Sequence, residues 1–316
     1  MGRMAMSNWD LIIVGGGPAG LTAALYGSRS GLSTLLLEEK TTGGLLSEIP
    51  VVENYPGFSE GVSGLDLAAK MTEQTRRAGA EIHEIETAQS VEVKGELFSV
   101  KTDRTNYSCG ALVLATGAVH RPLGVKGEEE LKGRGVSYCA LCDGAFFRGK
   151  TVAVAGGGNS AASSAVYMAG IARQVYLIHR RGELRAEQAW IKAIKDKGVR
   201  MLLDHEILGL KGEQKLQSIH IRNKVTDERS ELQVDGLFVE AGEIPNSELA
   251  VDLGAKVDGE GFILVNDRQE TSINGVFAVG DVTCFPVKQI STAVGQGAVA
   301  ATEAFCHLRR PYYRRG

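Results

Sequence analysis

The sequence has few prolines, little net charge and no long apolar run, three features that would otherwise assign it to a broad class of protein. Only seven of its 316 residues are proline, the net charge is −3, and no apolar run is long enough for a membrane helix. This composition offers no electrostatic footprint for nucleic acid. The first ten residues contain one arginine and no long apolar segment, which is unlike a signal peptide. We therefore expect a cytoplasmic protein that binds neither nucleic acid nor membrane.

Cysteine is also scarce, with five in the chain, and only Cys139 and Cys142 lie close together. A Cys-x-x-Cys pair can be half of a zinc site, but such a site needs a second pair. The other three cysteines are single and far apart: Cys109, Cys284 and Cys306. Two thiols at this spacing can also close into a disulfide and reopen, and Asp143 places an acid beside the second. An odd cysteine count with one close pair fits a reducing compartment. We expect a redox-active disulfide and no metal.

Glycine, by contrast, is abundant, with forty residues. An apolar run over residues 9–14, interpreted as a buried strand, leads directly into the segment GGGPAG and then a helical pattern. In this context Gly15 permits a tight turn, Gly17 lets the backbone approach a pyrophosphate, and Gly20 lets the helix pack on the strand. The next strand ends at Glu38, twenty-three residues after Gly15. A carboxylate there favours a ribose with a free 2′-hydroxyl. The first set of predicted dinucleotide contacts is Gly15, Gly17, Pro18, Ala19, Gly20 and Glu38.

The same pattern recurs after the cysteine pair. A strand over residues 150–155 leads into GGGNSA, and the following strand ends at His179, again twenty-three residues after the first glycine of the loop. Cations replace the acid here, and cations pair strongly with a 2′-phosphate. The alternative is a solvated basic turn. The second set of predicted contacts is Gly156, Gly158, Asn159, Ser160, Ala161, His179, Arg180, Arg181 and Arg185.

Each unit is closed by a further apolar strand that ends at a glycine, over residues 111–117 and 234–242. Strand ends of this kind line the ligand crevice of a doubly wound sheet. A strand over residues 275–281 then resumes the first unit. The predicted fold class is α/β, with two Rossmann-like dinucleotide-binding domains, the second inserted into the first. The predicted boundaries are 1–121, 122–247 and 248–316.

With these motifs the sequence resembles the low-molecular-weight thioredoxin reductases, two-domain flavoproteins, over nearly the whole chain. CALCDG matches the family's Cys-x-x-Cys-Asp-Gly, and His-Arg-Arg followed by Arg185 matches its NADPH signature. Residues 280–281 and 288–290 match its second FAD motif, and residues 53–57 its flavin-side loop. The resemblance implies FAD, NADPH, a homodimer, and thioredoxin or a thioredoxin-like partner. The further FAD contacts that it implies are Gly44, Leu45, Asn54, Thr116, Gly117, Gly280, Asp281, Lys288, Gln289 and Ile290.

The resemblance also implies catalytic roles for the cysteine segment. Cys142 faces the flavin, Cys139 attacks the partner's disulfide, and Asp143 is the acid; the alternative for Asp143 is a cap of the following turn. Since the disulfide and the second loop lie on one domain, we expect that domain to alternate between two poses on connections near residues 120–127 and 242–249.

The sequence departs from the family in three places. Leu45 stands where glutamine is common, and Ser163 and Ser164 replace two glutamates after the second loop. Residues 309–315 are basic and aromatic, and this tail either covers the flavin or is solvated.

Two other activities remain open. Ferredoxin or a second flavin could replace NADPH as the electron donor in the same fold, or the protein could be a redox-sensing flavoprotein without turnover. A pyridine-nucleotide oxidase is disfavoured, because it would not require the Cys-Asp arrangement.

Overall fold

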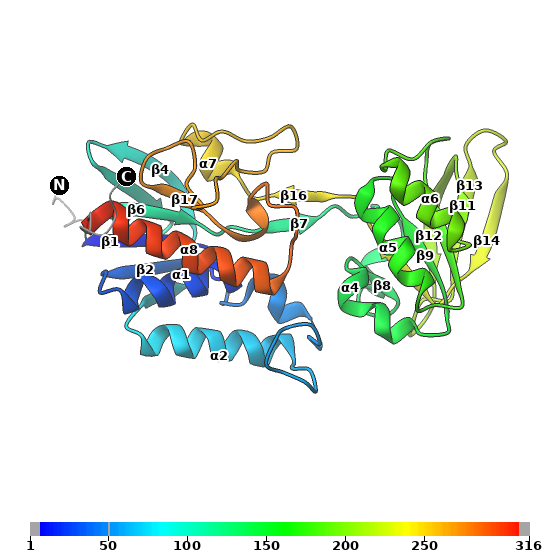
Figure 1. Cartoon of the computed structure of the whole chain (residues 1–316), viewed down its shortest axis with the longest axis horizontal. Helices are drawn as coiled ribbons and strands as arrows, with labels where there is room; N and C mark the ends of the chain where they lie inside the picture. The colour runs from blue at the N-terminus through cyan, green and yellow to red at the C-terminus, as the bar shows by residue number, and fades with distance from the viewer. Residues whose placement is uncertain (1–6, 50, 310–316) are drawn as a thin grey trace. The chain divides into compact units, whose positions relative to one another are not determined.

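The computed structural model describes residues 7–49 and 51–309. The predicted tail therefore lies outside the described residues, except for Arg309. By its internal contacts the chain divides into two units (Figure 1). Unit 1 comprises the segments up to Val119 and from Ile244, and unit 2 comprises His120–Glu243. The boundaries expected from sequence lie two and four residues further along the chain.

Unit 1 is built, over its described residues, on a seven-stranded sheet in the order β3-β2-β1-β6-β5-β4, with β17 paired to the second half of β6. β4 and β5 extend the sheet in antiparallel fashion, and the other strands are parallel. The central parallel strands β1, β2 and β6 contain buried apolar runs because both faces of the sheet are covered there. The strands are β1 (Ser7–Val14), β2 (Thr34–Glu38), β3 (Glu81–Glu84), β4 (Ala88–Lys94), β5 (Leu97–Thr102), β6 (Asn106–Leu114) and β17 (Val276–Ala278).

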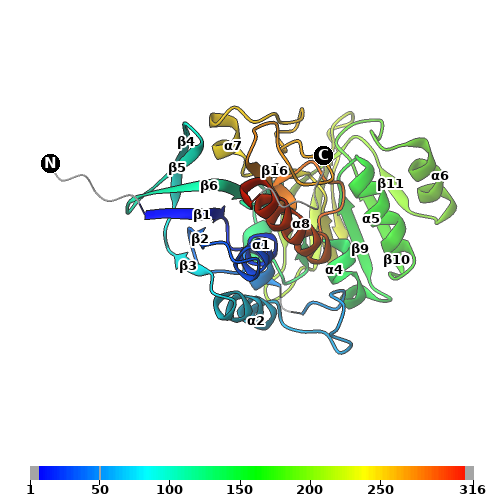
Figure 2. The same ribbon diagram turned by 60° about the vertical axis from the view of Figure 1, so that its left-hand side comes forward.

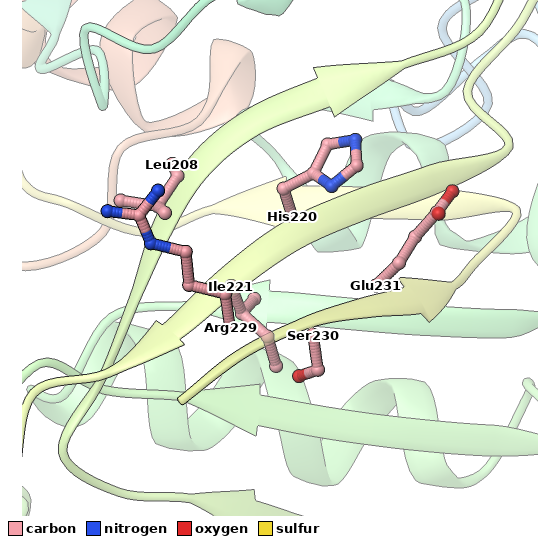
Figure 3. Close-up of a pocket in the computed structure, with 6 residues that line it drawn as sticks. All are labelled: Leu208, His220, Ile221, Arg229, Ser230 and Glu231. Atoms are coloured by element: carbon pink, nitrogen blue, oxygen red, sulfur yellow. The ribbon is translucent and has the colours of Figure 1, made fainter. Parts of the chain in front are cut away.

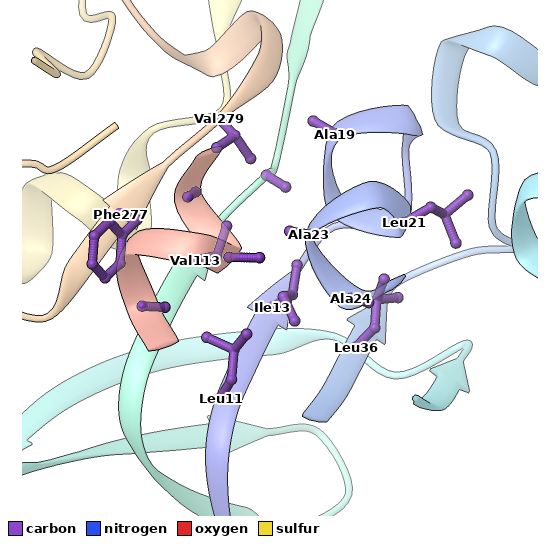
Figure 4. Packing of buried hydrophobic residues seen from close by; sticks show 14 of the residues in the cluster. Leu11, Ile13, Ala19, Leu21, Ala23, Ala24, Leu36, Val113, Phe277 and Val279 are labelled. Carbon is purple, nitrogen blue, oxygen red and sulfur yellow. The ribbon is translucent and has the colours of Figure 1, made fainter. Parts of the chain in front are cut away.

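Alternate residues of β1 enter two separate cores, since side chains of a strand point to opposite faces. Leu11 and Ile13 pack against α1 and α8 (Figure 4), whereas Ile12 and Val14 pack on the other face with α7. Both ribbon views show α1 and α8 side by side (Figure 2). The helical segments of unit 1 are α1 (Pro18–Arg29), η1 (Gly44–Glu48), α2 (Gly64–Arg77), α7 (Glu248–Asp252), η3 (Gly280–Val282) and α8 (Ile290–Arg309).

Gly297 allows α8 to approach α1 closely. A Cβ at this position would lie 2.3 Å from the carbonyl oxygen of Ala19 and 3.0 Å from the amide nitrogen of Ala23. A larger residue would therefore push α8 away from the first turns of α1.

Unit 2 contains a parallel sheet that the structure describes as five-stranded, in the order β11-β10-β9-β15-β8, and a three-stranded antiparallel sheet. The parallel strands are β8 (Val136–Ser137), β9 (Thr151–Ala155), β10 (Gln174–Ile178), β11 (Arg200–Leu202) and β15 (Gly236–Val239). The antiparallel strands are β12 (His205–Lys211), β13 (Ser218–Asn223) and β14 (Arg229–Gln233). The helical segments are α3 (Glu128–Leu131), α4 (Ala140–Asp143), η2 (Gly144–Phe147), α5 (Asn159–Ala169) and α6 (Gln188–Asp196).

The two parallel sheets repeat one design. β3-β2-β1-β6-β17 in unit 1 corresponds strand for strand to β11-β10-β9-β15-β8 in unit 2, and β1 and β9 each lead through a glycine loop into a helix. The predicted class, α/β with two Rossmann-like domains and the second inserted into the first, is confirmed.

The chain passes between the units through two strands, β7 (Ala118–His120) and β16 (Glu243–Pro245), which pair with each other. The two connections expected to be flexible, near residues 120–127 and 242–249, therefore overlap paired strands at His120 and at Glu243–Pro245. Within the described residues, no helix is long and apolar enough to span a membrane.

Candidate active site

The three predicted glycines of the first loop have different surroundings. Gly15 has a φ of +107°, and a Cβ there would lie 2.3 Å from the carbonyl oxygen of Ala115. A Cβ on Gly20 would lie 1.9 Å from the carbonyl oxygen of Gly15. Gly17 is the N-cap of α1, and a Cβ there would meet no protein atom within 4 Å. Gly15 and Gly20 close the loop. Gly17 leaves space at the helix N-terminus, where a pyrophosphate binds in such folds.

Glu38, at the end of β2, is fixed over this loop. The side chain is buried, and its carboxylate accepts hydrogen bonds from the amide of Gly16 at 2.6 Å and from the amide of Lys40 at 2.8 Å. An acid held beside the glycine loop suits a ligand with a free ribose hydroxyl.

The second glycine motif of unit 1 meets the first turn of α1. Pro18 is the first residue of that helix, and Ala19 is buried. A Cβ on Gly280, which has a φ of +75°, would lie 3.0 Å from the Cβ of Ala19. The amide of Gly280 donates to Oε1 of the buried Gln296 on α8 at 2.6 Å. Gln296 was not predicted, because only the folded chain brings its side chain to the loop.

Asp281 and Lys288 lie next to this turn. Burial raises the pKa of Asp281, and the charge of Lys288 opposes that shift. The ammonium of Lys288 donates to the backbone oxygens of Asp281, at 3.1 Å, and of Thr283. It also lies 4.4 Å from the ring centre of Phe262, within the range of a cation–π contact. Lys288 thus holds the backbone around Asp281.

Three segments that are distant in sequence meet around the predicted flavin loop. A Cβ on Gly44 would lie 3.4 Å from the Cα of Gly17. Asn54 donates a 3.1 Å hydrogen bond to Gln289, and Ile290 begins α8 and packs on the cluster around Leu46. The structure therefore brings these predicted positions to one part of unit 1. Leu45, in place of the family's glutamine, is exposed.

Thr116 and Gly117, after β6, are tied to Asn246. The side-chain amide of Asn246 donates to the carbonyl oxygen of Thr116 at 2.8 Å, and its backbone amide donates to that of Gly117 at 3.0 Å. The hydroxyl of Thr116 donates to the carbonyl oxygen of Asn246 at 2.5 Å. Sequence analysis missed Asn246, which lies 130 residues from its partner.

The loop of unit 2 follows the same plan. A Cβ on Gly156 would lie 2.5 Å from the carbonyl oxygen of Glu240 and 2.7 Å from the Cβ of Ala161. Gly158 is the N-cap of α5, and a Cβ there would meet no atom within 4 Å. Space is thus left at the helix N-terminus in both units, which fits a dinucleotide in each.

Asn159 and Ser160 lie exposed on the first turn of α5. Asn159 is held by Glu187, whose carboxylate accepts from the side-chain amide at 3.0 Å and whose backbone amide donates to Asn159 Oδ1 at 2.9 Å. Glu187 was not predicted, and its position two residues after Arg185 is the only sequence signal for it.

His179 occupies the position in unit 2 that Glu38 occupies in unit 1, but the surroundings of its side chain differ. A Cβ on Gly157 would lie 2.2 Å from ring atoms of His179, so the imidazole covers the loop glycine. Its Nε2 is closed off from solvent and meets no hydrogen-bond partner in the described part of the chain. Burial lowers the pKa of His179, and the charges of Arg181, Arg185 and Arg180 lower it further. The ring is therefore favoured in its neutral form, whereas the sequence suggested a cation.

The three arginines are exposed beside the loop. The backbone amide of Arg185 donates to the carbonyl oxygen of Gly157 at 2.7 Å, which brings this segment directly to the glycines. Arg180 and Arg181 follow His179 at the end of β10. The structure thus places three exposed arginines beside the loop, next to the buried imidazole of His179.

An acid that sequence analysis did not single out lies at the end of β15. Glu240 is half-buried, and its carboxyl accepts a 2.5 Å hydrogen bond from Ser164 on α5. Burial raises the pKa of Glu240, and the Ser164 hydroxyl opposes that shift. Ser164 stands where the family that the sequence resembles commonly has a glutamate. In this contact the carboxyl group therefore belongs to Glu240, at the end of β15, and the residue on α5 is a serine.

Cys139 and Cys142 form a disulfide with their Cα atoms 5.3 Å apart. Cys139 is the N-cap of the short helix α4, and its sulfur accepts from the amide of Cys142 at 3.1 Å. The predicted pairing of the two sulfurs is therefore present in the structure.

Asp143 follows the second cysteine and is bonded to Ser137. The hydroxyl of Ser137 donates to Asp143 Oδ2 at 2.6 Å, and the backbone amide of Asp143 donates to the carbonyl oxygen of Cys139 at 3.1 Å. Burial raises the pKa of Asp143, and the Ser137 hydroxyl opposes that shift. An acid whose pKa is raised is suited to proton transfer near neutral pH.

The remaining cysteines have no chemistry in common with this pair. Cys109 and Cys306 are buried, and burial raises the pKa of Cys109 to about 12. Cys284 is partly exposed. We assign packing and no catalytic role to these three thiols.

A shallow hollow of about 370 Å³ lies on the antiparallel sheet of unit 2 (Figure 3). Its lining residues are Leu208, His220, Ile221, Arg229, Ser230 and Glu231. None of them was predicted as a site residue, and none belongs to a glycine loop or to the cysteine segment.

Comparison with known proteins agrees with this geometry. Residues 9–297 match the family described as pyridine nucleotide-disulphide oxidoreductase. The chain is 42% identical to the thioredoxin reductase of Bacillus subtilis (strain 168), over 93% of this chain and 92% of that one. It is also 42% identical to the thioredoxin reductase of Mycolicibacterium smegmatis, over 93% and 95%.

A solved structure of thioredoxin reductase from Streptococcus pyogenes is similar to this fold, with a TM-score of 0.88 and 38% identity. The match covers 97% of this chain and 100% of that one. Membership of the matched family implies a flavin and a pyridine nucleotide. The chain belongs to the pyridine nucleotide-disulphide oxidoreductase family and, within it, to the thioredoxin reductases.

Proposed function

We propose that the protein uses NADPH and FAD to reduce the disulfide of thioredoxin or of a thioredoxin-like protein. The observation that carries this proposal is the Cys139–Cys142 disulfide, adjacent to Asp143 and on the same unit as the second dinucleotide loop. The FAD group, when bound, supplies two-electron transfer between NADPH and that disulfide.

The residues of unit 1 that would hold FAD are the loop glycines and the acid beside them. Gly17 leaves space for the pyrophosphate at the N-terminus of α1, and Glu38 would accept from the ribose. Gly44, Asp281 and Gln289 lie on the segments that meet this loop, and we propose them as contacts with the remainder of the cofactor.

Unit 2 would hold NADPH at the N-terminus of α5. The exposed Arg180, Arg181 and Arg185 carry the positive charge that a 2′-phosphate requires, because a guanidinium forms charge-assisted hydrogen bonds with phosphate oxygens. We exclude His179 from this phosphate-binding group, since its ring is buried over Gly157.

The cysteines pass the electrons to the partner. Once the disulfide is reduced, the thiolate of Cys139 attacks the partner's disulfide and forms a mixed disulfide, and the sulfur of Cys142 displaces the partner's second thiol. Asp143 gives a proton to a departing thiolate and regains one from water. The overall reaction consumes NADPH, one proton and the partner's disulfide, and it yields NADP⁺ and the partner's dithiol.

The surface beside the disulfide suits a protein substrate. Leu141 is 56% exposed and Phe146 is 49% exposed, and both lie within four residues of a cysteine of the pair. Exposed large apolar side chains next to a reactive group favour a macromolecular partner.

Anaerobic titration of the purified protein with NADPH tests the proposal. We expect a yellow protein whose flavin absorbance bleaches on addition of NADPH and returns on addition of oxidised thioredoxin. A colourless protein that cannot be reconstituted with flavin would contradict the proposal. So would a variant with serine at both Cys139 and Cys142 that still reduces thioredoxin.

The relatives do not favour the other activities considered from the sequence. Failure of NADPH to bleach the flavin would indicate ferredoxin or a second flavin as donor. Absence of thioredoxin turnover with every donor would indicate a redox sensor.

A homodimer, a cytoplasmic location and alternation of unit 2 between two poses remain proposals. Light scattering tests the first and cell fractionation the second. A cross-link that joins the units should abolish either flavin reduction or disulfide reduction if the third is correct.

A further inference from the structure

Ser137 occupies a buried position between Asp143 and the backbone of the cysteine turn. It is the last residue of β8 and is 6% exposed, and β8 is held in the parallel sheet by pairing of Ser137 with Phe238 on β15. Its hydroxyl oxygen lies 2.6 Å from Asp143 Oδ2, 3.1 Å from the amide nitrogen of Cys139 and 3.3 Å from the carbonyl oxygen of Cys139. The sheet thus fixes a hydroxyl group against the acid of the neighbouring turn.

A hydroxyl group has one proton to donate and two lone pairs to accept. The Cys139 amide donates to one lone pair of Ser137. The proton of Ser137 can point either to Asp143 Oδ2 or to the carbonyl oxygen of Cys139, because both acceptors are within hydrogen-bond distance. The choice requires only rotation about the C–O bond.

These two positions of the hydroxyl proton match the two protonation states of Asp143. When the carboxyl is ionised, Ser137 donates to it. When the carboxyl is protonated, it donates its own proton to the free lone pair of Ser137, and the serine proton turns to the carbonyl oxygen of Cys139. Asp143 is hydrogen-bonded in both states, and no heavy atom has to move.

We propose that Ser137 is the positioning residue for the acid of this reaction, a hydroxyl rotor that keeps Asp143 hydrogen-bonded whether or not it carries its proton. Proton release to a departing thiolate, and recovery of the proton from water, then need no rearrangement of the turn. This inference rests on the proposed role of Asp143 as the acid.

The surroundings of Asp143 leave Ser137 as its main polar influence. Burial raises the pKa of Asp143, the Ser137 hydroxyl lowers it, and no charged side chain of the described chain contributes to the shift. Titratable groups on the neighbouring segments include the two thiols of its own turn, when reduced, and Tyr138, whose hydroxyl donates to Glu128 at 2.8 Å. Tyr167 on α5 is another. The Tyr167 ring lies against the same turn, since a Cβ on Gly144 would be 2.9 Å from its Cε1.

The test compares Ser137→Ala with Ser137→Thr, which restores a hydroxyl, in the flavin-loaded protein. The pH dependence of thioredoxin reduction is measured at saturating NADPH, and the protonated carboxyl of Asp143 is titrated by redox-difference infrared spectroscopy. Asp143→Asn identifies the carboxyl band. Ser218→Ala is the matched control, because Ser218 is also buried and also donates to a carboxylate, that of Glu231 at 2.5 Å, away from the cysteines.

We expect Ser137→Ala to move the basic limb of the rate profile and the carboxyl titration to higher pH by about one pKa unit. The reason is that the hydrogen bond donated to the ionised carboxylate is stronger than the one accepted from the protonated acid, so loss of both favours the protonated form by on the order of one pKa unit. The maximal rate should fall about tenfold, Ser137→Thr should recover both readouts, and Ser218→Ala should change neither.

Unchanged rate and infrared titrations in a folded, flavin-loaded Ser137→Ala variant would overturn the proposal, as would a loss of rate with no change of either titration. If Asp143→Asn retained full activity across the pH range, the proposed role of Asp143 would fail instead. The infrared titration of Ser137→Ala would still decide whether the hydroxyl controls the carboxyl.

Discussion

The two glycine loops of this protein share a backbone and differ in the side chains that surround it. Gly15 and Gly156 each turn against the carbonyl oxygen of a strand-end residue, Ala115 in unit 1 and Glu240 in unit 2. The residue that closes over the loop is an acid bonded to a loop amide in unit 1, and a neutral, buried imidazole followed by arginines in unit 2. We therefore expect the shared backbone to account for binding of a dinucleotide in each unit, and we propose that the neighbouring side chains select which one is bound.

Adding a methyl group at the first glycine of each loop tests most directly whether the two loops bind different ligands. Gly15→Ala places a Cβ 2.3 Å from a carbonyl oxygen at a φ of +107°, and Gly156→Ala places one 2.5 Å from a carbonyl oxygen. Strain and overlap of this size cost about 1–3 kcal/mol each. We expect Gly15→Ala to lose flavin, about 100-fold in affinity. Gly156→Ala should keep its colour and bind NADPH about tenfold or more weakly. Flavin content and NADPH titration measure these effects.

The control for this pair is Gly295→Ala on α8, where a Cβ would meet no atom within 4 Å. It should retain both ligands. Loss of flavin from Gly156→Ala would show that the loops do not act independently. Retention of flavin by Gly15→Ala would contradict the assignment of flavin to the first loop.

Arg180 and Arg181 test whether the second loop binds a nucleotide with a 2′-phosphate. Removal of a charge-assisted hydrogen bond to a phosphate costs about 1.5–3 kcal/mol. We therefore expect Arg180→Gln and Arg181→Gln to raise the KM for NADPH about 10–100-fold and to leave the KM for NADH nearly unchanged. Steady-state kinetics with both nucleotides measure this. An equal effect on NADPH and NADH would contradict the assignment of a 2′-phosphate to this side of the loop.

His179 should make the stability of unit 2 sensitive to acid. Its pKa is lowered in the folded state, so the unfolded chain takes up a proton first as the pH falls. Stability from the neutral ring is present above about pH 6.5 and is lost as the pH decreases below that value. His179→Gln should flatten the dependence of Tm on pH between about 6.5 and 5, as measured by calorimetry. His220→Gln, at an exposed position on β13, is the control.

Glu240 should give Tm a pH dependence opposite to that of His179, and its effect should be the smallest of the four. Its pKa is raised in the folded state, so the penalty is absent below about pH 4.5 and grows as the pH rises and the buried carboxyl ionises. Glu240→Gln is expected to raise Tm at pH 8 by roughly 2–4 °C, the change that about 1 kcal/mol produces in a protein of about 150–250 residues. It should have little effect at pH 4. The exposed Glu213→Gln is the control, and equal shifts in both variants would contradict the burial argument.

The parts of the site that sequence analysis predicted are those determined by local backbone. Gly15, Gly17 and Gly20 are required by one turn and its helix, and Glu38 follows the adjacent strand at a fixed offset. The cysteine pair likewise lies within one turn. These features can be recognised because the partner residues are near in sequence or at a spacing that the parallel sheet imposes.

The parts that sequence analysis missed depend on contacts between distant segments. Asn246 bonds to Thr116 from 130 residues away, and Ser164 bonds to Glu240 from 76 residues away. His179 was predicted as one of the cations at its strand end, whereas burial and then the charges of the neighbouring arginines lower its pKa and favour the neutral form. Periodicity indicates that a side chain is at a strand end, but it does not indicate what covers that side chain.

The close packing of α8 on α1 has a consequence for synthesis of the protein. Unit 2 is one continuous stretch of chain, whereas unit 1 needs Gly297 of α8 against Ala19 near its other end. On a ribosome, the inserted unit can therefore complete its fold while the surrounding unit still waits for its final helix. Unit 1 therefore starts to form before unit 2 but is completed after it, once the segment that contains Gly297 has been made.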